Sequence, residues 1–283
     1  MKGQLFNKIL SFFVLIKFEH SVFALPFAYI GGIIAYKGIM PFYYWLWITL
    51  ACVFARTSAM LLNRIIDKEI DRKNPRTQNR PFITGRIKIK ETIPILILSI
   101  FLFLFSSFKL NLTCLFLSPI ALFLISSYPY TKRFTWTSHF YLGACLACAP
   151  IGGFLAVSGK CDVLSLILGL FVILWVSGFD IIYSLLDMQF DKEYNLYSIP
   201  QRFGERRAQQ ISFLLHILSG ILLIPFGILS QFGLKYWIGF FFIFLLLVRQ
   251  HIIIRDRNRI NEAFFTTNGM ISILFLFIVI FSY

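Results

Sequence analysis

The chain has 283 residues, of which 58% are hydrophobic, 18% are aromatic and only 14% are charged. Soluble domains average about 25% charged residues, so this composition excludes an ordinary soluble domain, and its apolar content excludes intrinsic disorder. The 27 Lys and Arg against 13 Asp and Glu give a formal net charge of +14. Such a charge is typical of a protein that binds nucleic acid, an anionic membrane surface or an anionic substrate.

Apolar stretches recur along the whole chain, each close to the ~20 residues that a helix needs to cross a bilayer. Barrel strands would alternate polar and apolar residues, and the runs 95–105 and 240–248 show no such alternation. The sequence therefore predicts an all-α, multi-pass membrane bundle that forms one domain over residues 1–283. About nine spans are expected, at 21–39, 43–66, 92–108, 111–129, 138–158, 162–187, 209–231, 234–252 and 264–282.

The basic residues predict the orientation of the bundle. Of the 27 Lys and Arg, 21 fall in the N-terminal segment and in every second connection, only four fall in the alternate connections, and Arg56 and Arg64 lie within a span. By the positive-inside rule, the basic face and the N-terminus are cytoplasmic and the C-terminus is outside. Glu19 and His20 then lie at the cytoplasmic start of the first span, where a solvated helix start is favoured over the edge of a pocket. No cleavable signal is expected, because further spans follow the first.

The segment 143–153, GACLACAPIGG, is rich in small residues and contains a C-x-x-C pair, Cys145 and Cys148. No His and no second cysteine pair lies nearby, so metal binding or redox chemistry is not favoured. Small residues at this density are typical of helices that approach each other closely in a membrane.

The first of two acidic clusters follows the second predicted span. Asn63, Asp67 and Asp71 are spaced i, i+4 and i+8, so on a continuing helix they share one face. A carboxylate at membrane depth is costly unless a cation accompanies it. This face therefore predicts a cation site inside the bundle.

The second acidic cluster lies at the end of the sixth predicted span and has the same character. Asp180, Tyr183, Asp187 and Asp191 are separated by steps of three, four and four, which again place them on one helical face. Two facing rows of oxygen ligands suit Mg²⁺, which usually keeps waters or substrate phosphates in its shell. The alternative is that the acids form salt bridges at the helix ends with their neighbours in sequence, which are Lys68, Arg72 and Lys192.

These residues resemble the motifs of the UbiA superfamily of intramembrane aromatic prenyltransferases. The N-x-x-x-D-x-x-x-D motif of that family is matched by Asn63, Asp67 and Asp71, and its D-x-x-x-D motif by Asp187 and Asp191. Its Y-x-x-x-K motif is matched by Tyr128 and Lys132, and the segment 76–85, RTQNRPFITG, is similar to the connection after its first motif. The resemblance covers essentially the whole chain, and the nine-helix layout of the family agrees with the number of predicted spans.

Within the superfamily, the chain looks most like the 4-hydroxybenzoate polyprenyltransferase branch, which includes enzymes that prenylate a dihydroxynaphthoate in the futalosine route to menaquinone. One departure concerns the residue directly after the motif Asn. Many 4-hydroxybenzoate enzymes have Asp there, and this chain has Arg64. The departure leaves open which aromatic acid is the acceptor.

The resemblance implies an Mg²⁺-dependent transfer of a polyprenyl group from a polyprenyl diphosphate to an aromatic acid in quinone biosynthesis (ubiquinone or menaquinone), in the bacterial cytoplasmic (inner) membrane. The implied metal ligands are Asn63, Asp67, Asp71, Asp187 and Asp191. Lys132 would act with these four aspartates in catalysis by stabilising the leaving diphosphate. The implied substrate-binding residues are Asn63, Arg56, Arg64, Tyr128, Asp180 and Tyr183.

Arg56 lies seven residues before Asn63, on the same face and deep in an apolar span. An arginine at that depth needs a counter-ion. The carboxylate of the aromatic substrate, Asp180 or another structural partner could each fill that role. Tyr128 and Tyr183 fit either the site or an aromatic belt at the membrane interface.

Three other classes of function fit less well. A secondary transporter would show inverted repeats and broken helices near the membrane midplane, whereas these acids cluster at helix ends on one side. The CDP-alcohol phosphotransferases also use intramembrane aspartates with Mg²⁺, but their D-x-x-D-G-x-x-A-R pattern is absent here. A nucleic-acid partner is not expected, because the basic residues are spread over separate connections with no soluble module.

Overall fold

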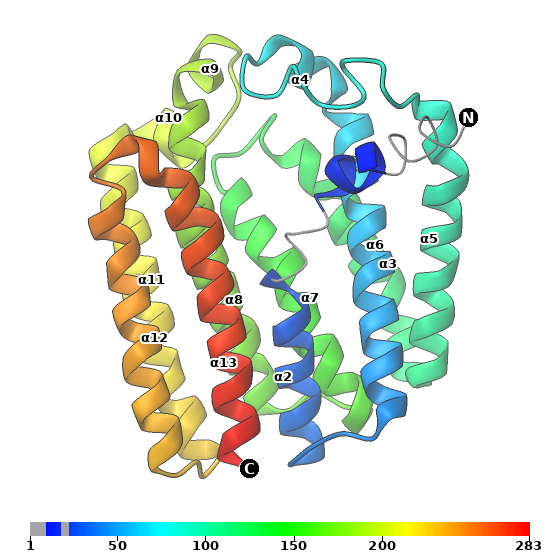
Figure 1. The fold of residues 1–283 in the computed structure, drawn as a ribbon, viewed down its shortest axis with the longest axis vertical. Helices are drawn as coiled ribbons and strands as arrows, with labels where there is room; N and C mark the ends of the chain where they lie inside the picture. The colour runs from blue at the N-terminus through cyan, green and yellow to red at the C-terminus, as the bar shows by residue number, and fades with distance from the viewer. Residues whose placement is uncertain (1–9, 18–22) are drawn as a thin grey trace.

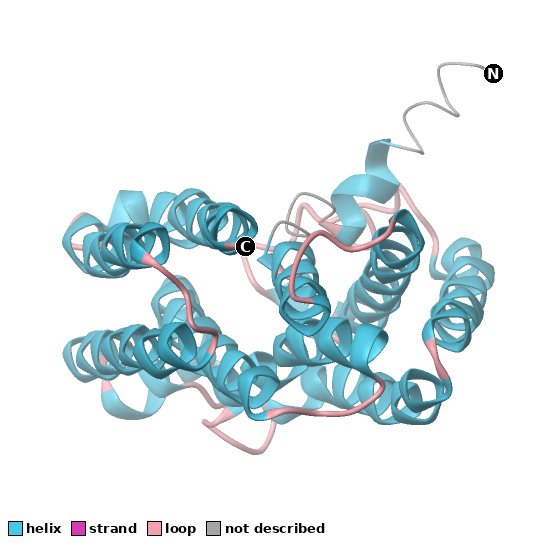
Figure 2. Cartoon of the chain, turned by 90° about the horizontal axis from the view of Figure 1, so that it is seen from below, coloured by secondary structure: helices cyan, strands magenta, loops and turns pink. Residues whose placement is uncertain are grey.

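A computed structural model of the chain describes residues 10–17 and 23–283, so Glu19 and His20 lie outside the described residues. Every regular element within those residues is a helix, as Figure 2 shows with the bundle seen from below. This confirms the all-α prediction. The long helices are α2 (Leu25–Tyr36), α3 (Phe42–Ile66), α5 (Ile89–Leu110), α6 (Leu112–Thr131), α7 (Ser138–Ser158), α8 (Val163–Ser184), α11 (Glu205–Leu229), α12 (Leu234–Ile253) and α13 (Asn268–Ser282).

Short helices lie in the connections. They are α4 (Lys68–Lys73), the 3₁₀ helix η2 (Leu185–Asp187), α9 (Met188–Glu193), α10 (Ile199–Phe203), the 3₁₀ helix η3 (Arg257–Arg259) and the π-helix η4 (Glu262–Thr267). Figure 1 shows α4, α9 and α10 gathered at one end of the bundle and the C-terminus at the other end. The basic connections between the long helices therefore share one end. Their assignment to the cytoplasm remains a prediction.

Eight helices in the described part of the chain are long and apolar enough to cross a membrane. The first predicted span is shorter than expected, because α2 has only 12 residues and ends at Tyr36. Lys37 adopts a left-handed conformation with φ of 58°, which stops the helix three residues before the predicted end. The count of nine spans thus remains a prediction.

The helix α2 lies inside the bundle and packs mainly against α7 and α13. A Cβ atom on Gly153 of α7 would collide with the carbonyl of Ala28 on α2, and one on Gly31 would collide with the carbonyl of Pro150. On the other side of α7, a Cβ on Gly143 would lie 2.6 Å from the carbonyl oxygen of Ile173 on α8. The small residues of segment 143–153 therefore allow close helix packing, as the sequence indicates.

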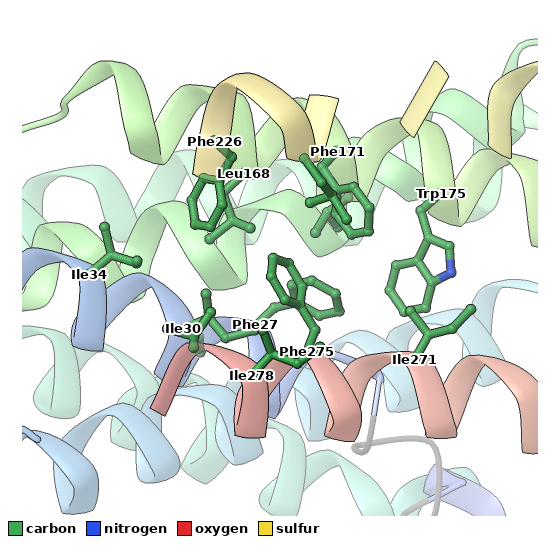
Figure 3. Packing of buried hydrophobic residues seen from close by; sticks show 14 of the residues in the cluster. Phe27, Ile30, Ile34, Leu168, Phe171, Trp175, Phe226, Ile271, Phe275 and Ile278 are labelled. Atoms are coloured by element: carbon green, nitrogen blue, oxygen red, sulfur yellow. The ribbon is translucent and has the colours of Figure 1, made fainter. Parts of the chain in front are cut away.

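A cluster of aromatic rings fills the core between α2, α8, α11 and α13. The rings of Phe27, Phe171, Trp175, Phe226 and Phe275 are fully buried, and Figure 3 shows Phe27 and Phe275 facing Phe171 and Phe226. The rings of Phe27 and Trp175 have centroids 5.0 Å apart, within the range of favourable aromatic pairs. This rigid packing fixes α8, whose end carries the second acidic cluster.

Both acidic clusters lie where a long helix bends into a short one. At the end of α3, Asp67 leaves helical geometry with ψ of 4°, but its N–H still donates to the carbonyl of Asn63 at 2.9 Å. The N–H of Asp71 donates to the carbonyl of Asp67 at 2.8 Å, so the helical hydrogen bonding continues into α4. The second cluster continues from α8 through η2 into α9. Each acidic row therefore keeps one face across its bend.

Candidate active site

A polar cavity of about 190 Å³ lies where the ends of α3, α6, α7 and α8 meet the short helices. The side chains from both acidic rows line it, as the spacing in the sequence predicts. Of the predicted site residues, those on this cavity are Asn63, Arg64, Asp67, Asp71, Tyr128, Lys132, Asp180, Tyr183, Asp187 and Asp191.

An apolar cavity of about 370 Å³ adjoins the polar one, and Asn63 and Tyr128 line both. It runs along α3 from Asn63 to Ile48, a rise of about 22 Å for 15 helical residues. Arg56, the remaining predicted site residue, lies on this apolar cavity. All the predicted residues therefore line one or both of two adjoining cavities, while their individual roles remain predictions.

Basic residues from two later segments of the chain pair with the first acidic row. Lys132 Nζ lies 2.5 Å from Asp67 Oδ2, and Asp67 is only 2% exposed. Arg133 adds a longer contact of 3.5 Å to Asp67 Oδ1. Arg80 pairs with Asp71, which is also buried.

The second acidic row is held in a similar way. Arg76 donates hydrogen bonds to both carboxylate oxygens of Asp187, from Nε to Oδ1 at 2.8 Å and from Nη2 to Oδ2. Arg76 Nη1 donates to the hydroxyl of Tyr183 at 2.9 Å, and Asn74 Nδ2 donates to Asp187 Oδ1 at 2.9 Å. Burial opposes the charge of Arg76, but the hydrogen bond and the charge of Asp187 outweigh it and raise the pKa of Arg76 above its ordinary value.

These pairings answer the alternative reading of the acids as local salt bridges at helix ends. Arg72 pairs with Glu69, which lies on the outside of α4. The cavity acids instead pair across the bundle, from Arg76 to Asp187 and from Lys132 to Asp67. The pairs therefore join elements that enclose one cavity.

Asp191 and Asp180 differ from the other cavity acids in their partners. Asp191 Oδ2 accepts a hydrogen bond from Ser198 Oγ at 2.8 Å. Asp180 Oδ2 lies 2.7 Å from His139 Nδ1, and the backbone N–H of Ile199 donates to His139 Nε2 at 3.2 Å. Within the described residues, neither acid forms an ion pair with a Lys or an Arg.

Arg56 and Arg64 both contact the chain that precedes α2. Arg56 Nη2 lies 3.3 Å from the carbonyl oxygen of Lys17, and Arg64 Nε lies 3.3 Å from that of Leu15. Arg64 Nη1 also lies 3.5 Å from Asn63 Oδ1. Arg56 therefore lines the apolar cavity and Arg64 lines the polar one, and each guanidinium group contacts a backbone carbonyl.

The donor set of the polar cavity fits Mg²⁺. Within the described residues, no three His, Cys, Asp or Glu side chains are close enough to hold a metal by themselves. Mg²⁺ is usually bound through one or two carboxylates together with waters and substrate phosphates, so a dedicated cage is not required. Asn63 and the four motif aspartates supply such oxygens on two facing rows. The basic residues beside them could neutralise the rest of a phosphate group.

Sequence reasoning missed several residues that line the polar cavity. Arg76 and Arg80 belong to the segment that matches the family connection, but the spacing alone did not place them against the acids. His139 was missed because a lone histidine at a helix start carries little information. Its proximity to Lys132 in the sequence was the one available signal.

The chain is similar to known proteins over most of its length. A model of the UbiA prenyltransferase family matches residues 24–279. A protein of Pseudoalteromonas translucida (strain TAC 125), named 4-hydroxybenzoate octaprenyltransferase, is 30% identical over 237 residues, which cover 83% of this chain and 80% of the relative.

Two solved structures have the same fold. A UbiA homolog from Aeropyrum pernix K1, in its apo form, gives a TM-score of 0.85 at 30% identity and covers 93% of this chain and 98% of its own. A UbiA homolog from Archaeoglobus fulgidus, bound to DMAPP and Mg²⁺, gives a TM-score of 0.73 at 21% identity, with coverage of 96% and 100%. At that lower identity the likeness shows the fold alone.

Proposed function

This chain belongs to the UbiA prenyltransferase family, and we propose that it transfers a polyprenyl group from a polyprenyl diphosphate to the ring of an aromatic acid. The observation that carries this proposal is the junction of the two cavities at Asn63 and Tyr128. A diphosphate needs cations and hydrogen-bond donors, which the polar cavity offers. An isoprenoid tail needs an apolar channel, which the neighbouring cavity offers.

The proposed acceptor is 4-hydroxybenzoate, because a relative that is 30% identical carries the name 4-hydroxybenzoate octaprenyltransferase. Dihydroxynaphthoate is the second candidate. Arg64 favours testing it, since this buried cation stands on the cavity wall where many 4-hydroxybenzoate enzymes have an aspartate. The product would be a precursor of ubiquinone in the first case and of menaquinone in the second.

Asn63, Asp67, Asp71, Asp187 and Asp191 would hold Mg²⁺, which a UbiA homolog from Archaeoglobus fulgidus binds together with DMAPP. When bound, Mg²⁺ supplies positive charge that stabilises the diphosphate as a leaving group. Lys132 would hold the diphosphate as the allylic C–O bond breaks, together with the arginines of the cavity wall.

The apolar cavity would serve the second half of the reaction. An allylic cation reacts with water unless water is excluded, and the walls of this cavity are mostly apolar. The ring carbon ortho to the hydroxyl of the acceptor then attacks the cation and loses a proton. Tyr128, at the junction of the cavities, would flank the reacting carbon.

Arg56 is proposed to bind the carboxylate of the aromatic acid. It lines the apolar cavity seven residues, or about 10 Å of helix, before Asn63. Asp180 pairs with His139, so another role fits that acid better than that of counter-ion to Arg56. A substrate carboxylate bound by Arg56 would place the aromatic ring between Arg56 and the diphosphate.

The protein is a membrane protein, and we place it in the bacterial cytoplasmic membrane with the polar cavity on the cytoplasmic side. The support is the gathering of the basic connections at the end of the bundle that holds α4, α9 and α10. A water-soluble aromatic acid would then enter from the cytoplasm and the isoprenoid from the lipid.

The deciding experiment incubates membranes containing the protein with Mg²⁺, a polyprenyl diphosphate and either 4-hydroxybenzoate or a dihydroxynaphthoate. Mass spectrometry should detect the prenylated acid, and chelation of Mg²⁺ by EDTA should abolish it. If neither acid yields product while the membranes take up a labelled solute, the transporter alternative would replace the proposal.

A further inference from the structure

One carboxylate of the polar cavity has a setting that neither metal binding nor diphosphate binding explains. Asp67, Asp71 and Asp187 each pair with an arginine or a lysine, and Asp191 belongs to the second aspartate motif. Asp180 is held instead by the imidazole of His139, at 2.7 Å. Its side chain is 17% exposed, whereas that of His139 is 3% exposed.

The position of Asp180 in depth also sets it apart. It lies on α8, seven residues before Asp187 of η2, which at the helical rise is about 10 Å further into the bundle. The residue directly before it, Phe179, lines the apolar cavity, while Asp180 itself lines the polar one. Asp180 therefore lies at the level where the two cavities adjoin, and it shares the polar cavity with Tyr128, which lines both.

The hydrogen bonds of His139 fix its tautomer. A backbone N–H can only donate, so Ile199 N–H requires a lone pair on His139 Nε2. The ring proton is then on Nδ1 and is donated to Asp180 Oδ2. The imidazole thus orients the carboxylate with one neutral N–H group, in contrast to the full positive charges that face the other acids.

We infer that Asp180 is the base that removes the ring proton of the aromatic acceptor, and that His139 is a positioning residue for it. This inference rests on the proposed function. The allylic C–O bond breaks with its electron pair on the diphosphate, and a pair of ring π electrons forms the new C–C bond. The C–H electron pair of the attacking carbon then restores the aromatic ring, and its proton passes to the free oxygen of Asp180.

The experiment compares wild type with Asp180→Asn, using the aromatic acid with hydrogen or deuterium at the positions ortho to its hydroxyl. Loss of a general base lowers kcat by about 10²–10⁴-fold. The KM for the diphosphate should change little. Because proton loss becomes slow in the variant, its kcat should show a deuterium isotope effect larger than that of the wild type.

Matched variants separate a chemical role from a structural one. Asp162→Asn changes an exposed carboxylate at the opposite end of the same helix and should leave both kcat and the isotope effect unchanged. His139→Leu should lower kcat and raise the isotope effect. His139→Gln should restore much of both, because an amide offers one donor and one acceptor in similar places. Protection of each variant from thermal unfolding by the prenyl diphosphate verifies its fold.

An Asp180→Asn enzyme with the kcat of the wild type would overturn the inference and leave the diphosphate as the proton acceptor. So would a lowered kcat with an unchanged isotope effect. If Asp180→Asn does not fold, the two His139 variants decide, and equal isotope effects in both would overturn the inference. Absence of product from the wild type would overturn the proposed function as well. If the wild type does form product, the proposed function stands, and the variants then test the role of Asp180 alone.

Discussion

The apolar cavity predicts that bulky residues on α3 limit the length of the isoprenoid that the enzyme accepts. Three alanines at four-residue intervals, Ala59, Ala55 and Ala51, line this cavity below Asn63. At 1.5 Å per residue they lie about 6, 12 and 18 Å from Asn63 along the helix. Phenylalanine at each position would therefore block the cavity at three different depths.

The size of the expected loss in kcat/KM comes from steric overlap, because burial of the isoprenoid tail in the cavity contributes little. A tail excluded from the cavity can lie in the lipid, which is as apolar as the protein wall. Overlap between a tail and an inserted ring costs about 1–3 kcal/mol, which corresponds to about 5–150-fold in kcat/KM. This loss should begin at the shortest chains for Ala59→Phe and at the longest chains for Ala51→Phe.

The assay measures kcat/KM for dimethylallyl, geranyl, farnesyl and geranylgeranyl diphosphates with each variant. Val53→Phe is the matched control, because residue 53 lies on α3 but does not line the cavity. The three cavity variants should cut off the series at successively greater chain lengths, and the control should not. The same chain-length profile in all three variants would refute the reasoning and indicate a tail that leaves sideways near Asn63.

Three further predictions concern the walls of the cavities. Asp67→Asn and Asp187→Asn should each abolish prenylated product in the mass-spectrometric assay; full activity in either would exclude that residue as a metal ligand. Arg76→Lys keeps the charge but loses the two-pronged grip on Asp187, so the KM for the diphosphate should rise by about tenfold; an unchanged KM would contradict this role. Arg56→Ala should raise the KM for the acceptor more than that for the diphosphate, and an unchanged acceptor KM would exclude carboxylate binding.

The sequence predicted the features that depend on local spacing. The residues of each acidic row share a face because helical periodicity places residues four apart on one side, and this survives the bends at Asp67 and η2. The fifth predicted span, 138–158, has the same bounds as α7. The length of the apolar run was enough to predict these bounds, because a membrane span ends where its apolar residues end.

Features that depend on distant partners were not predictable in the same way. Arg76 and Asp187 are 111 residues apart, and only the packing of α8 beside the connection after α3 brings them together. The dyad of His139 and Asp180 has a separation of 41 residues and depends on the backbone of Ile199 for its tautomer. The early end of α2 depends on one residue, Lys37, in a left-handed conformation that its residue type does not predict.

The division of the site into a charged cavity and an apolar one has a consequence for the departure of product. In the proposed reaction, the basic residues of the polar cavity would hold the diphosphate, while the apolar cavity would only enclose the tail. Once the C–O bond has broken, the prenylated acid no longer carries the group that the charged cavity binds. Its tail gains little from the protein relative to the surrounding lipid. Cleavage therefore removes the attraction of the charged cavity, and only the contact between Arg56 and the carboxylate would still hold the prenylated acid before it diffuses into the bilayer.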